Sequence, residues 1–292
     1  MAEIFQILIS GLSAGSIYAL SAVGFTLLWQ ASKTINFAQG EFVMLPAFFV
    51  LAGMEFLNLP LWAAVLTALV LSLLILGLMF KKLIVEPMLP HGTLPLVIAT
   101  IALGLLLKEG VKEFYSAQGQ PFPHIFPTDV MDILGAAVSL TDIFNLVVSF
   151  AAIIALQLFL MRTRTGRCMQ ATAQNPDVAQ ILGVDIKRMV LYTFLINGAL
   201  AAIASVLISP IYLAKFSNGE TLGLVAFIAA IVGGFNQIRG ALVGGLLIGV
   251  IDNLAAVYVS AQYRAAVPLI LLIIIIMVRP QGLLGTSEGR TV

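Results

Sequence analysis

The chain has 292 residues, of which 60% are hydrophobic and only 10% are charged. A soluble domain of this length carries about a quarter charged residues, so this composition excludes an ordinary water-soluble globule and predicts an integral membrane protein. The net charge of +1 gives no indication of a nucleic-acid partner. One cysteine (Cys168) and two distant histidines (His91 and His124) predict no internal disulfide and no metal site.

Long runs without charged residues mark the expected membrane spans in chain order. A spanning helix needs about 20 apolar residues at a rise of about 1.5 Å each, and the runs predict an all-α, polytopic bundle of roughly eight or nine helices. Pro46 suggests a broken or re-entrant second helix, and the pairs Gly233-Gly234 and Gly244-Gly245 suggest interruptions near the eighth. The runs cover residues 4–32, 42–54, 56–80, 92–107, 143–161, 189–214, 221–238, 240–251 and 265–278.

Basic residues predict how this single transmembrane domain, residues 1–292, is oriented. With nine spans and the N-terminus outside, eleven of the fifteen basic residues fall on the cytoplasmic side, as the positive-inside tendency requires. The C-terminus is then cytoplasmic. Segment 113–142 becomes an ordered outer loop, with a short interfacial helix as one possibility, and segment 162–188 becomes the longest cytoplasmic segment. The cytoplasmic residues are Lys33, Lys81, Lys82, Arg162, Arg164, Arg167, Lys187, Arg188, Arg239, Arg279 and Arg290.

Segment 162–188 carries signals for two short helices. A helix-favourable stretch ends at Gln174, and Asn175 with Pro176 then has the pattern of an N-cap followed by proline in the first turn. Gly183 is a plausible stop. The intervening apolar residues predict either contact with a partner protein or packing on the chain's own bundle, and both readings stand at this point. These residues are Val178, Ala179, Ile181 and Leu182.

Polar residues inside apolar segments are the candidates for a translocation pathway. The turn after the first span contains Asn36, Phe37, Gln39, Gly40 and Glu41, and it reads either as a pathway-lining turn or as a capping loop at the inner interface. Asn197 and Asp252 lie within later spans. Asp252 either lines a pathway or pairs locally, with backbone or with Arg239.

Four sequence blocks resemble the permeases of branched-chain amino acid ABC importers. They are GSIYALSAVGFTLLWQASKTINFAQGEF from Gly15, GRCMQATAQNPDVAQILGVD from Gly166, GGFNQIRGALVGGLLIG from Gly233 and RPQGLLG from Arg279. They follow one another in the family's order over nearly the whole chain, and the first block resembles the H-type subunit.

The resemblance implies a fold like that of type II importers and a place in the bacterial inner membrane. It implies two ABC ATPase subunits, a second permease of the M type and a periplasmic amino acid-binding protein as partners. The chain itself contains no G-x-x-x-x-G-K-[ST] phosphate loop, so ATP and Mg²⁺ would be bound by the partners and this chain would hold neither cofactor nor catalytic residue. The matching ATPase-coupling positions are Gly166, Arg167, Ala171, Asn175, Pro176 and Gly183.

Three residues depart from the family pattern: Gln39 and Pro46 keep other substrates open, and Gln170 in the coupling segment bears on the polar details of docking. Gln39, Pro46 and Gln170 stand where the family often has His, Gly and Arg. The same fold also carries urea or short amides, which is the first alternative. A stand-alone secondary transporter is less favoured because it would need several intramembrane charges, and Asp252 is nearly the only one. An embedded enzyme is disfavoured because no nucleophile–base pair is evident.

Overall fold

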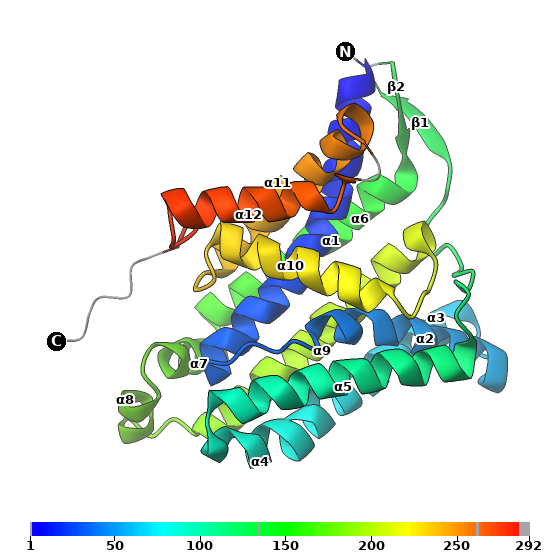
Figure 1. Cartoon of the computed structure of the whole chain (residues 1–292). Coiled ribbons are helices and arrows are strands. Elements are labelled where there is room, and N and C mark those ends of the chain that lie inside the picture. The colour runs from blue at the N-terminus through cyan, green and yellow to red at the C-terminus, as the bar shows by residue number, and fades with distance from the viewer. Residues whose placement is uncertain (1, 134, 261–262, 286–292) are drawn as a thin grey trace. The chain divides into compact units, whose positions relative to one another are not determined.

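The computed structural model describes residues 2–133, 135–260 and 263–285, and these residues form two compact units. Unit 1 comprises Met1–Thr26, Phe126–Phe150 and Leu224–Val292, and unit 2 comprises Leu27–Ile125 and Ala151–Gly223. Almost all of the regular structure is helical (Figure 1), which confirms the predicted all-α fold.

Seven helices of the described chain are long and apolar enough to cross a membrane. Two further apolar helices, α10 (Asn218–Gly233) and α12 (Ala266–Val278), have 16 and 13 residues. At about 1.5 Å per residue, each is shorter than a hydrocarbon core of about 30 Å. Nine predicted spans thus become seven long helices and two short ones. The seven are α1 (Ala2–Ser32), α2 (Gln39–Leu57), Leu61–Met88, α5 (Thr93–Tyr115), α6 (Leu140–Arg162), α9 (Ile186–Tyr212) and α11 (Ile238–Tyr258).

Unit 2 is built around α2 and α9, which pack against each other and against the helix Leu61–Met88. That helix begins as α3 (Leu61–Ser72), continues as the π-helical segments η1 (Leu73–Met79) and η2 (Lys81–Val85), and ends as α4 (Glu86–Met88). Glycines permit the close crossing of η1 and α9. A Cβ on Gly77 would meet the backbone of α9, and a Cβ on Gly198 would meet the carbonyl oxygen of Ser72.

The expected break at Pro46 is wrong, because α2 runs unbroken from Gln39 to Leu57 with Pro46 inside it. A proline in a helix leaves backbone groups without their usual partners, and neighbouring helices can satisfy them. Here the amide of the next residue, Ala47, donates a hydrogen bond to Oγ of Ser205 in α9, at 2.9 Å. A side chain that is remote in sequence therefore supports the helix where local sequence predicts a break.

Unit 1 joins the N-terminal part of α1 to α11 and α12. Small residues again allow close contact, since a Cβ on Gly15 would meet the backbone around Gly245. The chain does break at Gly233-Gly234, where α10 ends and Gly234 has φ +113°. It does not break at Gly244-Gly245, which lie inside α11. In the predicted outer loop, the described residues form an antiparallel hairpin, β1 (Val130–Ile133) with β2 (Ala136–Ser139), in place of the suggested short helix.

Candidate functional site

The polar turn after α1 is tied to α9 by a buried pair of amides in unit 2. Gln39 Nε2 donates to Asn197 Oδ1 at 2.8 Å, and Asn197 Nδ2 donates back to Gln39 Oε1 at 2.9 Å. The two residues are only 1% and 0% exposed. Two of the predicted pathway residues, 158 positions apart in sequence, are thus brought into direct contact.

The turn lies beside the middle of α5 and not at its end. The amide of Phe37 donates to Thr100 Oγ1 at 3.2 Å, and the Glu41 carboxylate lies against Gly104. Gly104 is the twelfth of the 23 residues of α5. The turn thus leads directly into α2 and lies against the middle of α5.

A short internal repeat, which the sequence analysis missed, accounts for the shape of this region. The letters FAQGE at residues 37–41 recur as FSNGE at residues 216–220. Each copy begins a helix, with amide, glycine and glutamate as the first three residues of α2 and of α10. The two copies meet at their glycines, where a Cβ on Gly40 would overlap the carbonyl of Gly219. Self-comparison of the sequence would have revealed the repeat.

One face of α5 contacts both copies of the repeat. Residues four positions apart share a helix face, and α5 presents Thr100, Gly104, Lys108 and Lys112 at this spacing. Thr100 accepts from the Phe37 amide, Gly104 adjoins Glu41, and Lys108 Nζ lies 2.6 Å from Glu220 Oε2. The Lys112 ammonium lies 5.7 Å from the centre of the Phe216 ring, which is cation–π distance.

Asp252, the remaining pathway candidate, lies in unit 1 and is engaged in a local ion pair. Arg264 Nε donates to its Oδ1 at 2.8 Å, Arg264 Nη2 donates to its Oδ2 at 2.5 Å, and the Tyr18 hydroxyl donates to the same oxygen at 3.3 Å. The suggested partner Arg239 is therefore wrong, because the bidentate ion pair is made with Arg264. The pair joins α11 to the residues just before α12.

The predicted cytoplasmic segment forms two short helices in unit 2, α7 (Arg164–Gln174) and α8 (Pro176–Ile181) (Figure 1). Asn175 Oδ1 accepts from the Val178 amide at 3.1 Å, as the predicted N-cap requires. Gly183 follows with φ +84°, which suits a helix stop. At the start of α7, Thr163 Oγ1 accepts from the Gly166 amide at 2.9 Å. The local signals thus predicted both helices correctly.

The six predicted coupling residues occupy different environments. Arg167, Asn175, Pro176 and Gly183 are exposed, and Ala171 is half-buried. Gly166 is buried, and a Cβ there would overlap the Phe159 carbonyl and the backbone of Leu160. Glycine is therefore required where α7 turns back on the end of α6.

The end of α8 presents a small apolar tip, which we define as Val178, Ile181 and Leu182. These side chains are 49%, 84% and 76% exposed. Ala179, which the sequence pattern groups with them, is 2% exposed and packs inward. The tip is flanked in sequence by exposed basic residues, among them Arg162, Arg164 and Arg167 before it and Arg188 after it.

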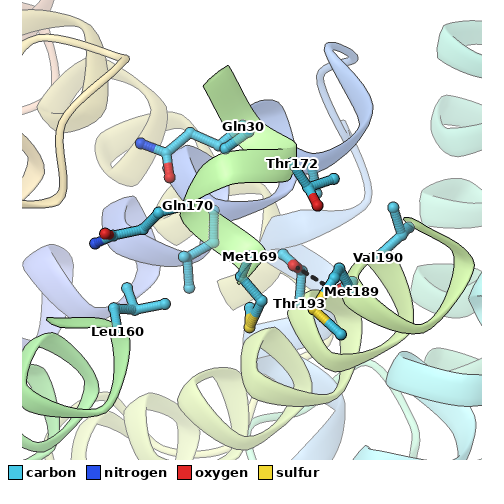
Figure 2. Close-up of a pocket in the computed structure, with 11 residues that line it drawn as sticks. Gln30, Leu160, Met169, Gln170, Thr172, Met189, Val190 and Thr193 are labelled. Atoms are coloured by element: carbon cyan, nitrogen blue, oxygen red, sulfur yellow. Dashed lines mark hydrogen bonds between the residues drawn. The ribbon is translucent and has the colours of Figure 1, made fainter. Parts of the chain in front are cut away.

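A small hollow lies beneath α7, between it, the end of α1 and the start of α9 (Figure 2). Met169 and Met189 line it, and Thr193 Oγ1 donates to the Met189 carbonyl at 3.1 Å on its wall. The methionines allow α7 to pack adaptably here, because unbranched thioether side chains fill irregular gaps.

Comparison with known proteins identifies the family. A family model described as "Branched-chain amino acid transport system / permease component" matches residues 7–276. The chain is 32% identical over 307 aligned residues to the high-affinity branched-chain amino acid transport system permease protein BraD of Pseudomonas aeruginosa, and the alignment covers 100% of both chains. It is 30% identical to the corresponding permease protein LivH of Escherichia coli, covering 98% of this chain and 97% of that one.

A solved structure, PsaBC from Streptococcus pneumoniae in complex with Fab, matches the fold with a TM-score of 0.51 and 13% identity. The match covers 94% of this chain and 91% of that one, and it shows the fold alone. The family model and the full-length relatives carry the assignment: the chain belongs to the family of permease components of branched-chain amino acid transport systems.

Proposed function

We propose that this chain is the membrane-spanning permease subunit of an ABC importer that carries branched-chain or similar aliphatic amino acids across the bacterial inner membrane. Partner ATPases bind ATP and Mg²⁺ and drive the cycle. A periplasmic binding protein delivers the substrate, and a second permease of the M type completes the pathway. The N-terminus is periplasmic and the C-terminus cytoplasmic.

The arm formed by α7 and α8 is the observation that carries this proposal. An apolar tip that stays exposed in a membrane protein's polar segment favours a protein partner, because burial of one such side chain is worth about 1.5–3 kcal/mol. The arm is supported at its base, where Gly166 fits closely against α6 and α7 packs on α9. Movement of a docked ATPase would therefore be transmitted to α9, and through the Gln39–Asn197 pair to α2.

The repeat and the adjacent face of α5 supply the pathway. Glu220, paired with Lys108, has a side chain 71% exposed on unit 2, and Phe37 is 43% exposed beside the middle of α5. A charged side chain that faces lipid is costly. A water-filled path or a second permease against this face removes that cost. Asn36, Gln39, Gly40, Glu41 and Asn197 belong to this region, whereas Asp252 serves unit 1 as an ion-pair partner.

Purification of the tagged chain from its native membrane in mild detergent tests the proposal. We expect two ATPases and a second permease to co-purify, and we expect hydrolysis to be stimulated by the loaded binding protein. Ile181→Asp should lower ATPase recovery about tenfold, since loss of one buried aliphatic contact exceeds about 1.4 kcal/mol. Gln180→Asp is the matched control, because it adds the same charge at a neighbouring exposed position of α8 without removing an apolar side chain.

Two results would contradict the proposal. Ile181→Asp could retain its ATPases as well as Gln180→Asp does, which would remove the docking role of the tip. Alternatively the wild-type chain could purify alone and take up substrate under an ion gradient without ATP, which would make it a secondary transporter.

A further inference from the structure

The two glutamates of the internal repeat have unequal surroundings. Glu220 is exposed and forms an ion pair with Lys108, with 2.6 Å between Oε2 and Nζ. Glu41 is only 7% exposed. Within residues 2–133, 135–260 and 263–285, no Lys, Arg or His nitrogen lies within 4 Å of its carboxylate. Lys108 on α5 thus forms an ion pair with Glu220 and acts on Glu41 only from a longer distance.

Glycine backbone packs closely against the Glu41 carboxylate. A Cβ on Gly219 would lie 3.0 Å from Glu41 Oε1, and a Cβ on Gly104 would lie 3.3 Å from Oε2. Burial disfavours the charged form of Glu41, whereas its own backbone amide, the more distant Lys108 ammonium and the positive N-terminal end of α2 favour it. These groups do not fill the roughly four acceptor positions of a carboxylate, and a buried charge without a close counter-ion is costly. In a transport protein, a buried carboxylate of this kind is suited to reversible binding of a cationic group.

The same turn contains a second buried polar side chain with an unused hydrogen-bond donor. Asn36 is 5% exposed, and its Oδ1 accepts from the Ala38 amide at 3.1 Å. Its Nδ2 has no hydrogen-bond partner among the described residues. Unpaired buried amide donors are rare in folded proteins, and each requires an explanation. Among the described residues, the turn therefore offers a buried carboxylate with no ion-pair partner within 4 Å and, close to it in sequence, an unpaired amide donor.

We infer that Glu41 receives the α-ammonium group of the amino acid during its passage and that Asn36 Nδ2 donates to the α-carboxylate. An ammonium has three donors and no acceptor, which suits a carboxylate, whereas the amide donor suits a carboxylate oxygen. The pair recognises what all α-amino acids share and leaves the side chain free. This inference rests on the proposed function, since it assigns the cargo group that one part of the pathway holds.

Uptake and ATP hydrolysis by the reconstituted full complex separate this role from a structural one. Glu41→Gln keeps the size of the side chain and removes its charge. We expect it to lower leucine uptake about tenfold, the worth of a charge-assisted hydrogen bond, while hydrolysis stimulated by the loaded binding protein stays within about twofold. Glu55→Gln, the same change at the exposed far end of α2, is the matched control and should leave both rates unchanged. Equal loss of uptake and hydrolysis in Glu41→Gln, or no loss of either, would overturn the inference.

A protection experiment reads the site directly and does not depend on turnover. Phe37→Cys in a Cys168→Ser background places a single thiol beside the turn, because Cys168 is the chain's one cysteine. We expect leucine and 3-methylbutylamine to slow thiol modification, and 4-methylpentanoate, which lacks the ammonium, to have no effect. Addition of Glu41→Gln should abolish the protection, and Glu41→Asp should retain part of it. Protection by 4-methylpentanoate equal to that by leucine would overturn the inference.

These experiments distinguish failure of the proposed function from failure of the ammonium site. If the wild-type complex shows no hydrolysis stimulated by the binding protein, the importer assignment fails. If hydrolysis is normal but Glu41→Gln transports and is protected like wild type, only the ammonium site fails.

Discussion

Gln39 and Asn197 form a two-way amide pair that is almost fully buried between α2 and α9. Loss of one partner leaves the other with unpaired polar atoms, which costs about 1–3 kcal/mol, whereas loss of both can cost much less. We expect Gln39→Leu and Asn197→Leu each to lower the unfolding temperature of the purified chain. The double variant should lose less than the sum of the two, and a strictly additive result would show that the pair is not coupled.

Asp252 and Arg264 make the bidentate ion pair of unit 1, with Asp252 only 5% exposed. Removal of one member of a buried pair costs about 3–5 kcal/mol because the other charge remains without its partner. We expect Asp252→Ala to destabilise the chain strongly and Asp252→Ala/Arg264→Ala to recover part of the loss. Thermal unfolding in detergent measures both. If Asp252→Ala instead leaves stability unchanged and reduces only uptake, Asp252 belongs to the pathway after all.

At the residue scale, the sequence predicts which polar residues are notable better than it predicts which residues they contact. Asp252 is recognisable as an intramembrane carboxylate with a possible local partner, but Arg264 is twelve positions away across the bend between two helices, and no local rule selects it over Arg239. Gln39 and Asn197 both stand out as polar residues in apolar surroundings, yet their contact joins positions 158 apart and depends on how α2 packs on α9. Such pairings come from tertiary packing.

Gly166 sets the geometry of the whole α7–α8 arm, because the backbone of α6 leaves no room for a side chain there. We expect Gly166→Ala to shift the arm and to reduce stimulated ATP hydrolysis about tenfold, since forced overpacking costs about 1–3 kcal/mol. The matched control is Gly110→Ala on α5, where a Cβ would meet nothing within 4 Å. Comparable activity in the two variants would show that the arm tolerates the shift.

Asn175 caps α8 through one oxygen only, Oδ1. Asn175→Asp keeps an acceptor at that position, and a negative charge at a helix N-terminus is favourable. Asn175→Ala removes the cap at a cost of about 1 kcal/mol. We expect coupling of hydrolysis to uptake to fall in the alanine variant and to be kept in the aspartate variant. Equal losses in both would mean that Asn175 contacts the partner directly through its Nδ2.

At the element scale, local signals succeed where local forces decide. The Asn175–Pro176 start and the Gly183 stop predict α8 correctly, because capping depends on a few adjacent residues. The predicted break at Pro46 is wrong because Ser205, from another helix, takes the amide of Ala47. The hairpin of β1 and β2 is not predicted, because a short hairpin in a proline-containing loop has only a weak alternation of apolar and polar residues.

The repeat of FAQGE and FSNGE organises unit 2 at a larger scale than any one helix. Two helix starts with the same three residue types meet glycine to glycine, and one face of α5 contacts both. Discontinuous helices whose N-termini converge near the middle of a bundle are a recurrent way to bind polar cargo in membrane transporters. Both copies of the repeat can be found in the amino-acid sequence. An alignment of the chain with itself is therefore enough to locate the centre of the candidate site. The contact between the copies, by contrast, depends on the packing of α2, α5 and α10.

The proposed orientation of the chain rests on the distribution of its basic residues, and its one native cysteine can test it. Cys168 lies in α7, which we place in the cytoplasm, and Asp132 lies exposed in β1, which we place outside. A membrane-impermeant maleimide should label Cys168 in inside-out vesicles and not in intact spheroplasts. Asp132→Cys in a Cys168→Ser background should show the opposite pattern.

Because Cys168 is half-buried, Gln174→Cys in the same background supplies an exposed second probe on α7. Labelling of either α7 position from outside would reverse the orientation. The arm could then not reach ATPases in the cytoplasm, and the importer mechanism would fail together with the topology, since both depend on the same eleven basic residues facing inward.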